Sequence, residues 1–271
     1  MAYEYTFGFI GCGNMGGALA AAAAKTLGGE ALILADHDRE KAAALASRLG
    51  SHCGSNEEAA QNCRYLFLGV KPQMMAGLFA TLAPVLRART DRFVLVTMAA
   101  GLTISRIREL SGGDYPIIRI MPNTPASVGE GMLLYTAGEG VTDEEKSAFV
   151  SHMAGAGLLE ELPEHPIDAG SAVSGCGPAF ADLFMEALAD GGVACGLPRD
   201  KAQLYAAQML LGSARLLLES RDHPGLLKDR VCSPGGSTIA GVRALESRAF
   251  RGAVMEAVEA AYQKTVALGQ N

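Results

Sequence analysis

A glycine pattern near the start of the chain constrains its fold more than any other feature of the sequence. An apolar run over 7–10 leads into G-x-G-x-x-G, and an alanine-rich helical pattern follows directly. Gly11 allows a tight turn out of a strand, Gly13 lets the backbone approach a pyrophosphate, and Gly16 lets the next helix pack close to a sheet. The start of that helix presents free N–H groups to an anion.

The context of these glycines is that of a dinucleotide site. A second apolar run, over 31–35, ends at Asp36, where an acidic residue binds a ribose hydroxyl in such sites. We therefore predict a dinucleotide-binding turn, the alternative being a structural turn without a ligand. The turn residues assigned to the cofactor are Gly11, Cys12, Gly13, Asn14, Met15 and Gly16, with Asp36 beyond them.

Strand and helix patterns alternate over the first half of the chain. The predicted strands after the first two cover 65–70, 93–97, 117–121, 131–136 and 157–162. Several of these are apolar throughout, as in strands that are buried on both faces, and helical patterns separate them. The alternation predicts an α/β fold with a doubly wound, mostly parallel Rossmann-type sheet covered by helices on both faces.

Ligands of such sheets lie beyond the carboxyl ends of the strands. Four segments that follow predicted strands are rich in Gly, Pro or small residues, and we expect them to line one crevice. Ordinary turns are the alternative for each segment taken alone. The four are 11–16, Lys71-Pro72, Ala99-Ala100-Gly101 and Pro122-Asn123-Thr124-Pro125.

The character of the chain changes near residue 164. Strand signals vanish and long helical patterns take over, so we divide the chain into a dinucleotide-binding domain over 1–164 and an all-α domain over 165–271. The pattern over 199–219 is apolar on nearly all sides, which is more apolar surface than a small domain can bury. We predict a symmetric subunit interface there, the alternative being a helix central to its own domain.

One loop of the helical domain has the composition of an anion site. The segment 231–238, Val-Cys-Ser-Pro-Gly-Gly-Ser-Thr, places two glycines and hydroxyl residues directly before a helical pattern. Backbone N–H groups in such a loop bind phosphate or carboxylate. A capped helix start is the alternative explanation for Ser237 and Thr238, and the Pro-Gly-Gly before them favours the ligand site.

Composition narrows the classes of function. The net charge of −6 argues against nucleic-acid binding, and no apolar run is long enough to span a bilayer. The N-terminus lacks the pattern of a signal peptide. The six cysteines and five histidines show no metal-ligand spacing, so we expect no metal site and reduced thiols in a cytoplasmic protein.

Several motifs in one order resemble the pyrroline-5-carboxylate reductase family over essentially the whole chain. They are FIGCGNMG at 9–16, VKP at 70–72, AAGLTI at 99–104, RIMPNTP at 119–125, GCGPA at 175–179, ADGG at 189–192 and SPGGSTIAG at 233–241. The resemblance implies NAD(P)H-dependent reduction of 1-pyrroline-5-carboxylate to L-proline, in proline biosynthesis. It also implies a homodimer, which often assembles into a decamer.

The resemblance also implies site residues. The cofactor would be held by the glycine turn together with Asn56, Val70, Lys71, Pro72, Ala99, Ala100, Gly101 and Asn123. The substrate carboxylate would rest on Val231, Ser233, Gly235, Gly236, Ser237 and Thr238 of the neighbouring subunit, so that the active site needs the dimer. Thr238 is the candidate catalytic residue, with its hydroxyl near the ring nitrogen. Because a protonated imine needs little acid catalysis, positioning carries most of the rate.

One residue departs from the family pattern. Relatives that favour NADPH tend to carry Ser or Thr at the end of the second strand, whereas this chain has Asp36. Its carboxylate suits a ribose 2′-hydroxyl and repels a 2′-phosphate, while Arg39 and Lys41 soften that repulsion. We therefore expect a preference for NADH with use of both cofactors left open. If Asp36 only caps a helix, the preference between NADH and NADPH stays open.

Two other functions stay open. One is another Rossmann oxidoreductase, such as a β-hydroxyacid dehydrogenase, but the catalytic lysine of that class has no counterpart over 180–195. The other is a non-catalytic sensor that binds a dinucleotide. A sensor needs no substrate anion site, so the loop over 233–238 argues against it.

Overall fold

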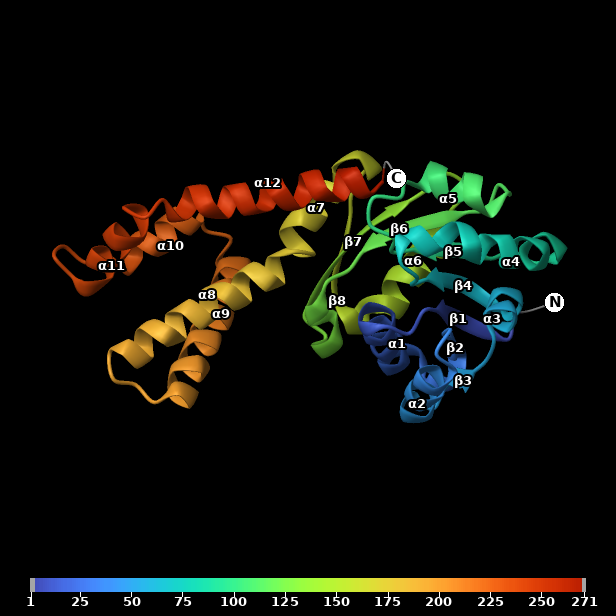
Figure 1. Cartoon of the computed structure of the whole chain (residues 1–271), viewed down its shortest axis with the longest axis horizontal. Helices are drawn as coiled ribbons and strands as arrows, with labels where there is room; N and C mark the ends of the chain where they lie inside the picture. Colours follow the sequence, from blue (N-terminus) through green and yellow to red (C-terminus); the bar gives the residue numbers. More distant parts are fainter. Residues whose placement is uncertain (1–2, 270–271) are drawn as a thin grey trace. The chain divides into compact units, whose positions relative to one another are not determined.

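The computed structural model describes residues 3–269 and separates into two compact units. One unit comprises the chain up to Cys176 together with the segment from Ala261 onward, and the other comprises Gly177–Ala260. Figure 1 shows strands and helices in the first unit and helices alone in the second. The chain therefore leaves the first unit once and returns to it.

One eight-stranded sheet forms the frame of the first unit, with strand order β3-β2-β1-β4-β5-β6-β7-β8. All neighbouring strands are parallel except β6 and β7. The strands are β1 (Tyr5–Ile10), β2 (Leu32–Ala35), β3 (His52–Cys53), β4 (Cys63–Leu68), β5 (Val94–Thr97), β6 (Ile117–Met121), β7 (Gly131–Ala137) and β8 (Gly157–Glu161). The predicted Rossmann-type sheet is confirmed, with one strand, β3, that the sequence pattern did not predict.

Helices cover both faces of this sheet and bury two large clusters of apolar side chains, with a smaller third cluster around Ile167. The helices are α1 (Asn14–Leu27), α2 (Arg39–Leu49), α3 (Asn56–Asn62), α4 (Met75–Ala88), α5 (Ile104–Ser111), α6 (Asp143–Met153) and α7 (Glu164–Ser174). In β4, Tyr65 and Phe67 join the cluster under α1, α2 and α6, whereas Leu66 and Leu68 join the cluster under α3, α4 and α5. The alternation of side chains along each strand thus fills both cores.

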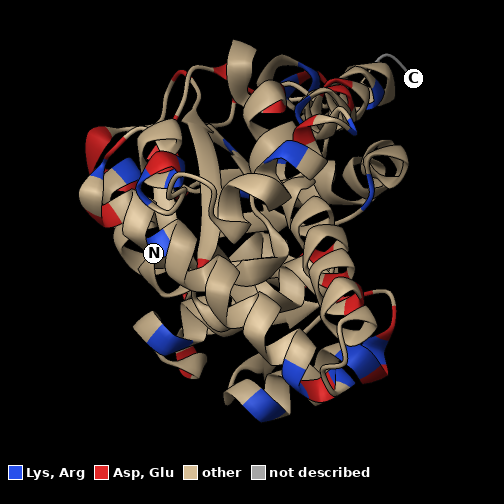
Figure 2. Cartoon of the chain, turned by 90° about the vertical axis from the view of Figure 1, so that its left-hand side faces the viewer, with Lys and Arg blue, Asp and Glu red and all other residues tan. Residues whose placement is uncertain are grey.

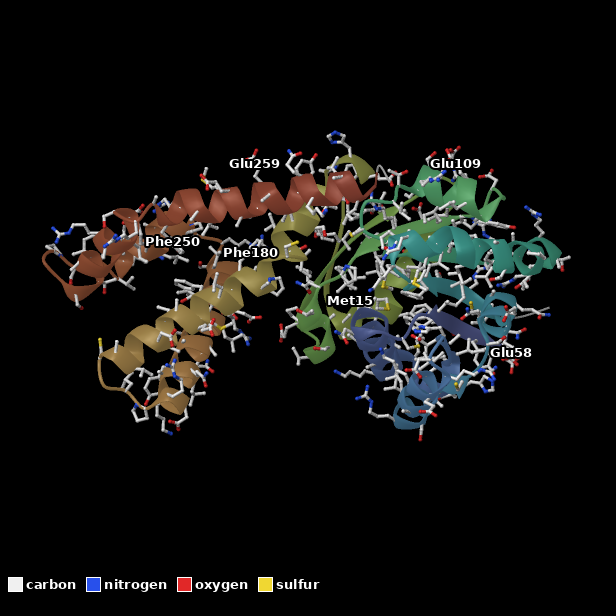
Figure 3. The ribbon with its side chains drawn as sticks, in the orientation of Figure 1. Met15, Glu58, Glu109, Phe180, Phe250 and Glu259 are labelled. Carbon is white, nitrogen blue, oxygen red and sulfur yellow. The ribbon has the colours of Figure 1, made fainter. Side chains whose placement is uncertain are left out.

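The second unit contains α8 (Gly177–Ala194), α9 (Arg199–Ser220), α10 (Pro224–Arg230), α11 (Ser237–Glu246) and the first part of α12 (Phe250–Leu268). The rings of Phe184 and Phe250 pack 5.7 Å apart between α8 and α12, and Figure 3 labels Phe250. Only Ala202 and Ala206 of α9 are buried, whereas Leu218 is 73% exposed in the single chain. The alternative of a helix central to its own domain is therefore wrong for α9.

The compact units divide later than the predicted boundary at 164/165, because α7 packs on the sheet. Ile167 lies in a buried cluster with Met121 and Leu134. Nη2 of the buried Arg119 on β6 lies 2.5 Å from a carboxylate oxygen of Asp168. These contacts join α7 to β6 and β7, so the division by contacts falls between α7 and α8.

Charges of both signs are mixed along the ribbon in Figure 2, and most of the residues drawn there carry none. Within residues 3–269, no helix is long and apolar enough to cross a membrane. Over the same residues, no three His, Cys, Asp or Glu side chains are grouped as a metal would require.

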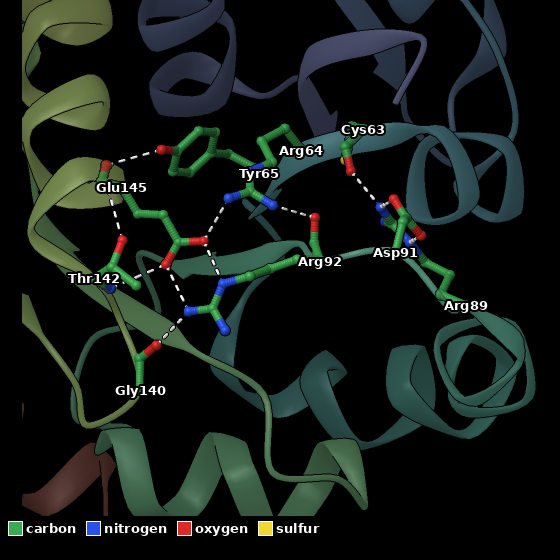
Figure 4. Close-up of polar contacts among 9 residues, drawn as sticks. All are labelled: Cys63, Arg64, Tyr65, Arg89, Asp91, Arg92, Gly140, Thr142 and Glu145. Carbon is green, nitrogen blue, oxygen red and sulfur yellow. Dashed lines mark hydrogen bonds and ion pairs between the residues drawn. The ribbon is translucent and has the colours of Figure 1, made fainter. Parts of the chain in front are cut away.

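A buried carboxylate joins α6 to the amino-terminal ends of β4 and β5 (Figure 4). One oxygen of Glu145 accepts hydrogen bonds from Arg64 at 2.6 Å and from Arg92 at 2.7 Å, and the other accepts from the N–H of Thr142 at 3.0 Å. The hydroxyl of Tyr65 donates to the Glu145 carbonyl at 2.8 Å. Burial alone would raise the pKa of Glu145, but the hydrogen bonds and charges of Arg92 and Arg64 hold it below 4.5.

We expect Glu145→Gln to lower the free energy of unfolding at neutral pH by about 2 to 3 kcal/mol, because it leaves two guanidinium groups without their carboxylate. A lowered pKa in the folded state stabilises the fold above the unfolded value of 4.5 and loses that effect as the pH falls further. The gap between the two proteins in urea unfolding should therefore close below about pH 4.5. Glu160→Gln, on the exposed side of β8, is the matched control and should show no such gap.

Candidate functional site

Three glycines bring the backbones of β1, β4 and α1 into contact. A Cβ at Gly16 would lie 2.0 Å from the carbonyl oxygen of Gly11, and a Cβ at Gly69 would lie 2.7 Å from the same atom. Gly11 has a φ of +98°, and its N–H donates to the carbonyl of Ala35 at 2.8 Å. No larger residue fits at these positions without moving backbone. The end of β1 is thereby enclosed on two sides.

Gly13 lies in the opposite environment. Nothing lies within 4 Å of the place that its Cβ would occupy. Gly13 is the N-cap residue of α1, no side chain caps this helix, and its first turn holds no acidic residue. The start of α1 therefore offers backbone N–H groups and the positive end of the helix dipole to open space, which fits a pyrophosphate.

Four other helices of this unit start differently, since a side chain accepts one of their first N–H groups, whereas α4 and α7 follow Met74 and Pro163 without such a cap. The capping residues are Asp38 for α2, Ser55 for α3, Thr103 for α5 and Thr142 for α6. A capped start leaves fewer N–H groups for a ligand. Within the sheet unit, the glycine start of α1 is thus suited to an anion where these four are not.

Two of the predicted turn residues contribute main chain rather than side chain. The thiol of Cys12 is buried and donates to the carbonyl of Ala35 at 3.4 Å. Burial, and to a smaller extent the charge of Asp36, raise its pKa to about 12, so it stays a thiol at neutral pH. Met15, labelled in Figure 3, is partly buried against the apolar cluster, and Asn14 is exposed at the start of α1.

Asp36 fixes the glycine turn to the end of β2. Its side chain is only 5% exposed, and its oxygens accept the N–H of Cys12 at 2.6 Å and the N–H of Asp38 at 3.0 Å. It does not cap α2, because Asp38 does so by accepting from the N–H of Lys41 at 3.1 Å. The alternative that Asp36 is only a helix cap is therefore wrong. Nδ1 of His37 also lies 2.8 Å from one of the Asp36 oxygens, so the carboxylate retains one lone pair, on the other oxygen, for a ribose hydroxyl.

The parallel register brings the other predicted loops to the same edge of the sheet. Ile10 pairs with Leu68, and Leu68 pairs with Thr97. The segments 70–72 and 99–101, which follow β4 and β5, therefore begin level with the glycine turn. The structure thus brings together the strand-end segments that the sequence assigned to one crevice.

The structure places the two asparagines that were predicted to bind the cofactor in different settings. Ser55, with Glu58, forms the capping box of α3, so Asn56 is the first helical residue and not the cap. The amide oxygen of Asn123 accepts the N–H of Met132 at 3.0 Å, and its amide nitrogen donates to the carbonyl of Ser174 at 2.9 Å. A cofactor contact by the Asn123 side chain has the second amide N–H and the second lone pair of the amide oxygen to use.

The loop between α10 and α11 resembles the glycine turn, because each ends in a glycine that is the N-cap residue of the next helix. Gly236 is the N-cap residue of α11, and no side chain caps this helix. Gly235 has a φ of +72°, and the N–H of Gly236 donates to the carbonyl of Ser233 at 3.0 Å. Ser237 and Thr238 are the first two residues of α11. The capping explanation of these two residues is therefore wrong.

The side chains of this loop are open to contact in the single chain. Val231 is 63% exposed, and Ser233, Ser237 and Thr238 are exposed as well. Uncapped N–H groups at the start of α11, with hydroxyls beside them, fit a carboxylate. The structure thus places all six predicted substrate residues on one short segment of the helical unit.

Two features beside the glycine turn were not predicted from the sequence. Gly69 is needed for the approach of β4 to the turn, and the signal for it was a glycine directly after an apolar strand. A groove of about 660 Å³ beside Gly13 and Asn14 is lined by Lys41 and Arg48 of α2. Their spacing of seven places both on one face of a helix, which was the available signal.

Two family models match this chain, one over the glycine turn and one over the 233–238 loop. The family model for pyrroline-5-carboxylate reductase dimerisation matches residues 164–268. The model for NADP oxidoreductase, coenzyme F420-dependent, matches residues 6–101.

Among curated relatives, pyrroline-5-carboxylate reductase of Escherichia coli is 39% identical, covering 99% of this chain and 100% of its own. The reductase of that name from Synechocystis is 44% identical over 79% of both chains. Among solved structures, pyrroline carboxylate reductase of Plasmodium falciparum with NADP bound is 33% identical, with a TM-score of 0.88. That match covers 99% of this chain and 100% of the other.

Two glycine variants should separate ligand binding from folding. Gly13→Ala puts a methyl group into the open space at the start of α1, so we expect it to weaken dinucleotide binding about tenfold and to lower the melting temperature only slightly, as alanine is the poorer N-cap. Gly16→Ala meets the Gly11 carbonyl and should lower the melting temperature strongly. Titration with NADH and NADPH, paired with thermal unfolding, measures both effects. Wild-type affinity in Gly13→Ala would show that the phosphates bind elsewhere.

Proposed function

The chain belongs to the pyrroline-5-carboxylate reductase family, and from this we propose that it reduces 1-pyrroline-5-carboxylate to L-proline with NAD(P)H. Hydride adds to the imine carbon, and the ring nitrogen becomes the amine of proline. The observation that carries this function is the length of the match. It covers 99% of the chain and so includes both the glycine turn and the 233–238 loop.

On the cofactor side, the start of α1 holds the pyrophosphate, and the segments 70–72 and 99–101 flank the nicotinamide half. A bound NAD(P)H supplies the hydride. The chain itself positions the two reactants and donates no proton in this step, because the imine is already protonated on nitrogen. Pre-organised positioning supplies most of the rate in such a reaction.

On the substrate side, the N–H groups at the start of α11 and the hydroxyls beside them bind the carboxylate. The hydroxyl oxygen of Thr238 accepts a hydrogen bond from the protonated ring nitrogen and orients the imine carbon. Support for this assignment comes from the glycine N-cap of α11, which leaves those N–H groups without a side-chain partner at the cap.

The site is completed by a second subunit that supplies the 233–238 loop. Support comes from the dimerisation family that matches 164–268 and from the exposed apolar side chains of α9. Dimers assemble further into a decamer in this proposal. We place the enzyme in the cytoplasm, in line with six cysteines that form no disulfide in the structure.

NADH is the preferred cofactor in this proposal. Asp36 accepts two backbone N–H groups and has little exposed surface, so its carboxylate cannot turn away from a 2′-phosphate. Like charges placed side by side cost several kcal/mol. Arg39 and Lys41 reduce the penalty and allow some use of NADPH.

The direct test follows the oxidation of NADH and of NADPH with 1-pyrroline-5-carboxylate as substrate. Turnover with either cofactor is the expected result, with the larger kcat/KM for NADH. Binding of dinucleotide without turnover would favour the sensor instead. Turnover of a β-hydroxyacid alone would favour the other class of Rossmann oxidoreductase.

Asp36→Ser should raise the ratio of kcat/KM for NADPH over NADH by about tenfold or more, because it removes the charge that faces a 2′-phosphate. Asp38→Ser is the matched control. It removes an equal charge two residues away and keeps a capping residue for α2, so the ratio should stay near the wild-type value. An equal shift in both variants would contradict a specific role for Asp36.

Thr238→Ala should lower kcat/KM for 1-pyrroline-5-carboxylate by about tenfold, the usual effect of losing one hydrogen bond to a charged group. Thr238→Ser keeps the hydroxyl and should recover most of that loss. The affinity for NADH in the absence of substrate should be the same in both variants. Full activity of Thr238→Ala would remove this residue from the mechanism.

A further inference from the structure

Two glycines from distant parts of the sequence touch at the loop after β5. A Cβ at Gly269 would lie 2.1 Å from the carbonyl oxygen of Gly101. A Cβ at Gly101 would lie 2.6 Å from the nitrogen of Gly269 and 2.8 Å from the carbonyl oxygen of Thr265. The last turn of α12 and this loop thus meet backbone to backbone, within the sheet unit.

The loop holds small residues only, and the N–H of Ala99 donates to the hydroxyl of Thr97 across 3.4 Å. Its side chains are two methyl groups, and Gly101 takes a φ of +79°. Ala99 is buried in the core, so one end of the loop is fixed. The N–H of Leu102 donates to the Ala99 carbonyl across a long 3.3 Å. Gly101, at the other end, is held by the end of α12.

We propose that residues 265–269, the C-terminal turn of α12, form a positioning element for the cofactor loop 99–101. The turn contacts the face of the loop that is directed into the protein. The opposite face of the loop contacts the nicotinamide half of the cofactor. The proposal rests on the proposed function, which assigns 99–101 to the cofactor. The turn itself touches neither substrate nor reacting atoms and acts only through the loop.

Two variants disturb this contact in opposite ways. Gly269→Ala adds a methyl group where no space exists and pushes the loop outward. A chain that ends at Leu268 removes the Gly269 part of the contact and leaves only the Thr265 carbonyl beside Gly101. Both should weaken NADH binding, and lower kcat, by about tenfold, because small displacements of a reacting group carry large penalties. The KM for 1-pyrroline-5-carboxylate should not change.

The isotope effect separates positioning from general stability. With NADH deuterated at the transferred position, a misplaced nicotinamide makes hydride transfer slower and more rate-limiting, so the isotope effect on kcat should rise in both variants. Gly77→Ala is the control, since Gly77 is exposed on α4 with open space around its Cβ. It should keep the wild-type NADH affinity and isotope effect.

NADH binding by the two variants decides whether the turn positions the loop. Weaker NADH binding in both variants supports the proposal, and this readout needs no substrate, so it stands even if the proposed reaction is wrong. If the shortened chain binds NADH and turns over as the wild type does, the turn is only a neighbour of the loop and the proposal fails. Loss of folding in Gly269→Ala leaves the shortened chain to decide between the two.

Discussion

The carbonyl oxygen of Gly11 is the atom on which the cofactor side depends. Gly16 and Gly69 approach it so closely that only hydrogen fits at either position. This contact brings the start of α1 and the end of β4 together beside the end of β1. Without it, the uncapped N–H groups of α1 would not lie at the edge where the other strand-end loops begin. Close backbone approach, rather than any side chain, therefore places the open start of α1 at the edge where the proposed dinucleotide site lies.

A helix start that follows glycine and has no side-chain cap occurs in both units. Glycine precedes both α1 and α11, and no side chain caps either helix, while Asp38, Ser55, Thr103 and Thr142 cap four other helices. An uncapped start keeps its N–H groups and its partial positive charge for a ligand. The chain thus meets the two anions of the proposed reaction, a pyrophosphate and a carboxylate, with one physical solution. In that proposal no histidine or acid is needed for the chemistry, because the imine is already protonated on nitrogen.

The order of strands and helices could be predicted because apolar periodicity is local. β3 was missed since two residues show no period. The contacts of Asn123 with Met132 and Ser174, and of Gly101 with Gly269, join residues distant in sequence, and neither has a local signal. The roles of Asp36 and Asp38 could be told apart only by geometry, because both are acidic residues before one helix. Local patterns therefore predicted the loops of the site but not what supports them.

The helix α12 begins in one compact unit and ends in the other, which makes the helical unit an insertion within the sheet unit. During synthesis, residues 177–260 leave the ribosome before the last turns of α12, so the inserted unit can collapse while the sheet unit still lacks a piece. The sheet unit then completes through a contact of high sequence separation, the slow kind in folding. The loop over 99–101 therefore gains its contact with Gly269 only after the last turn of α12 has packed against the sheet unit.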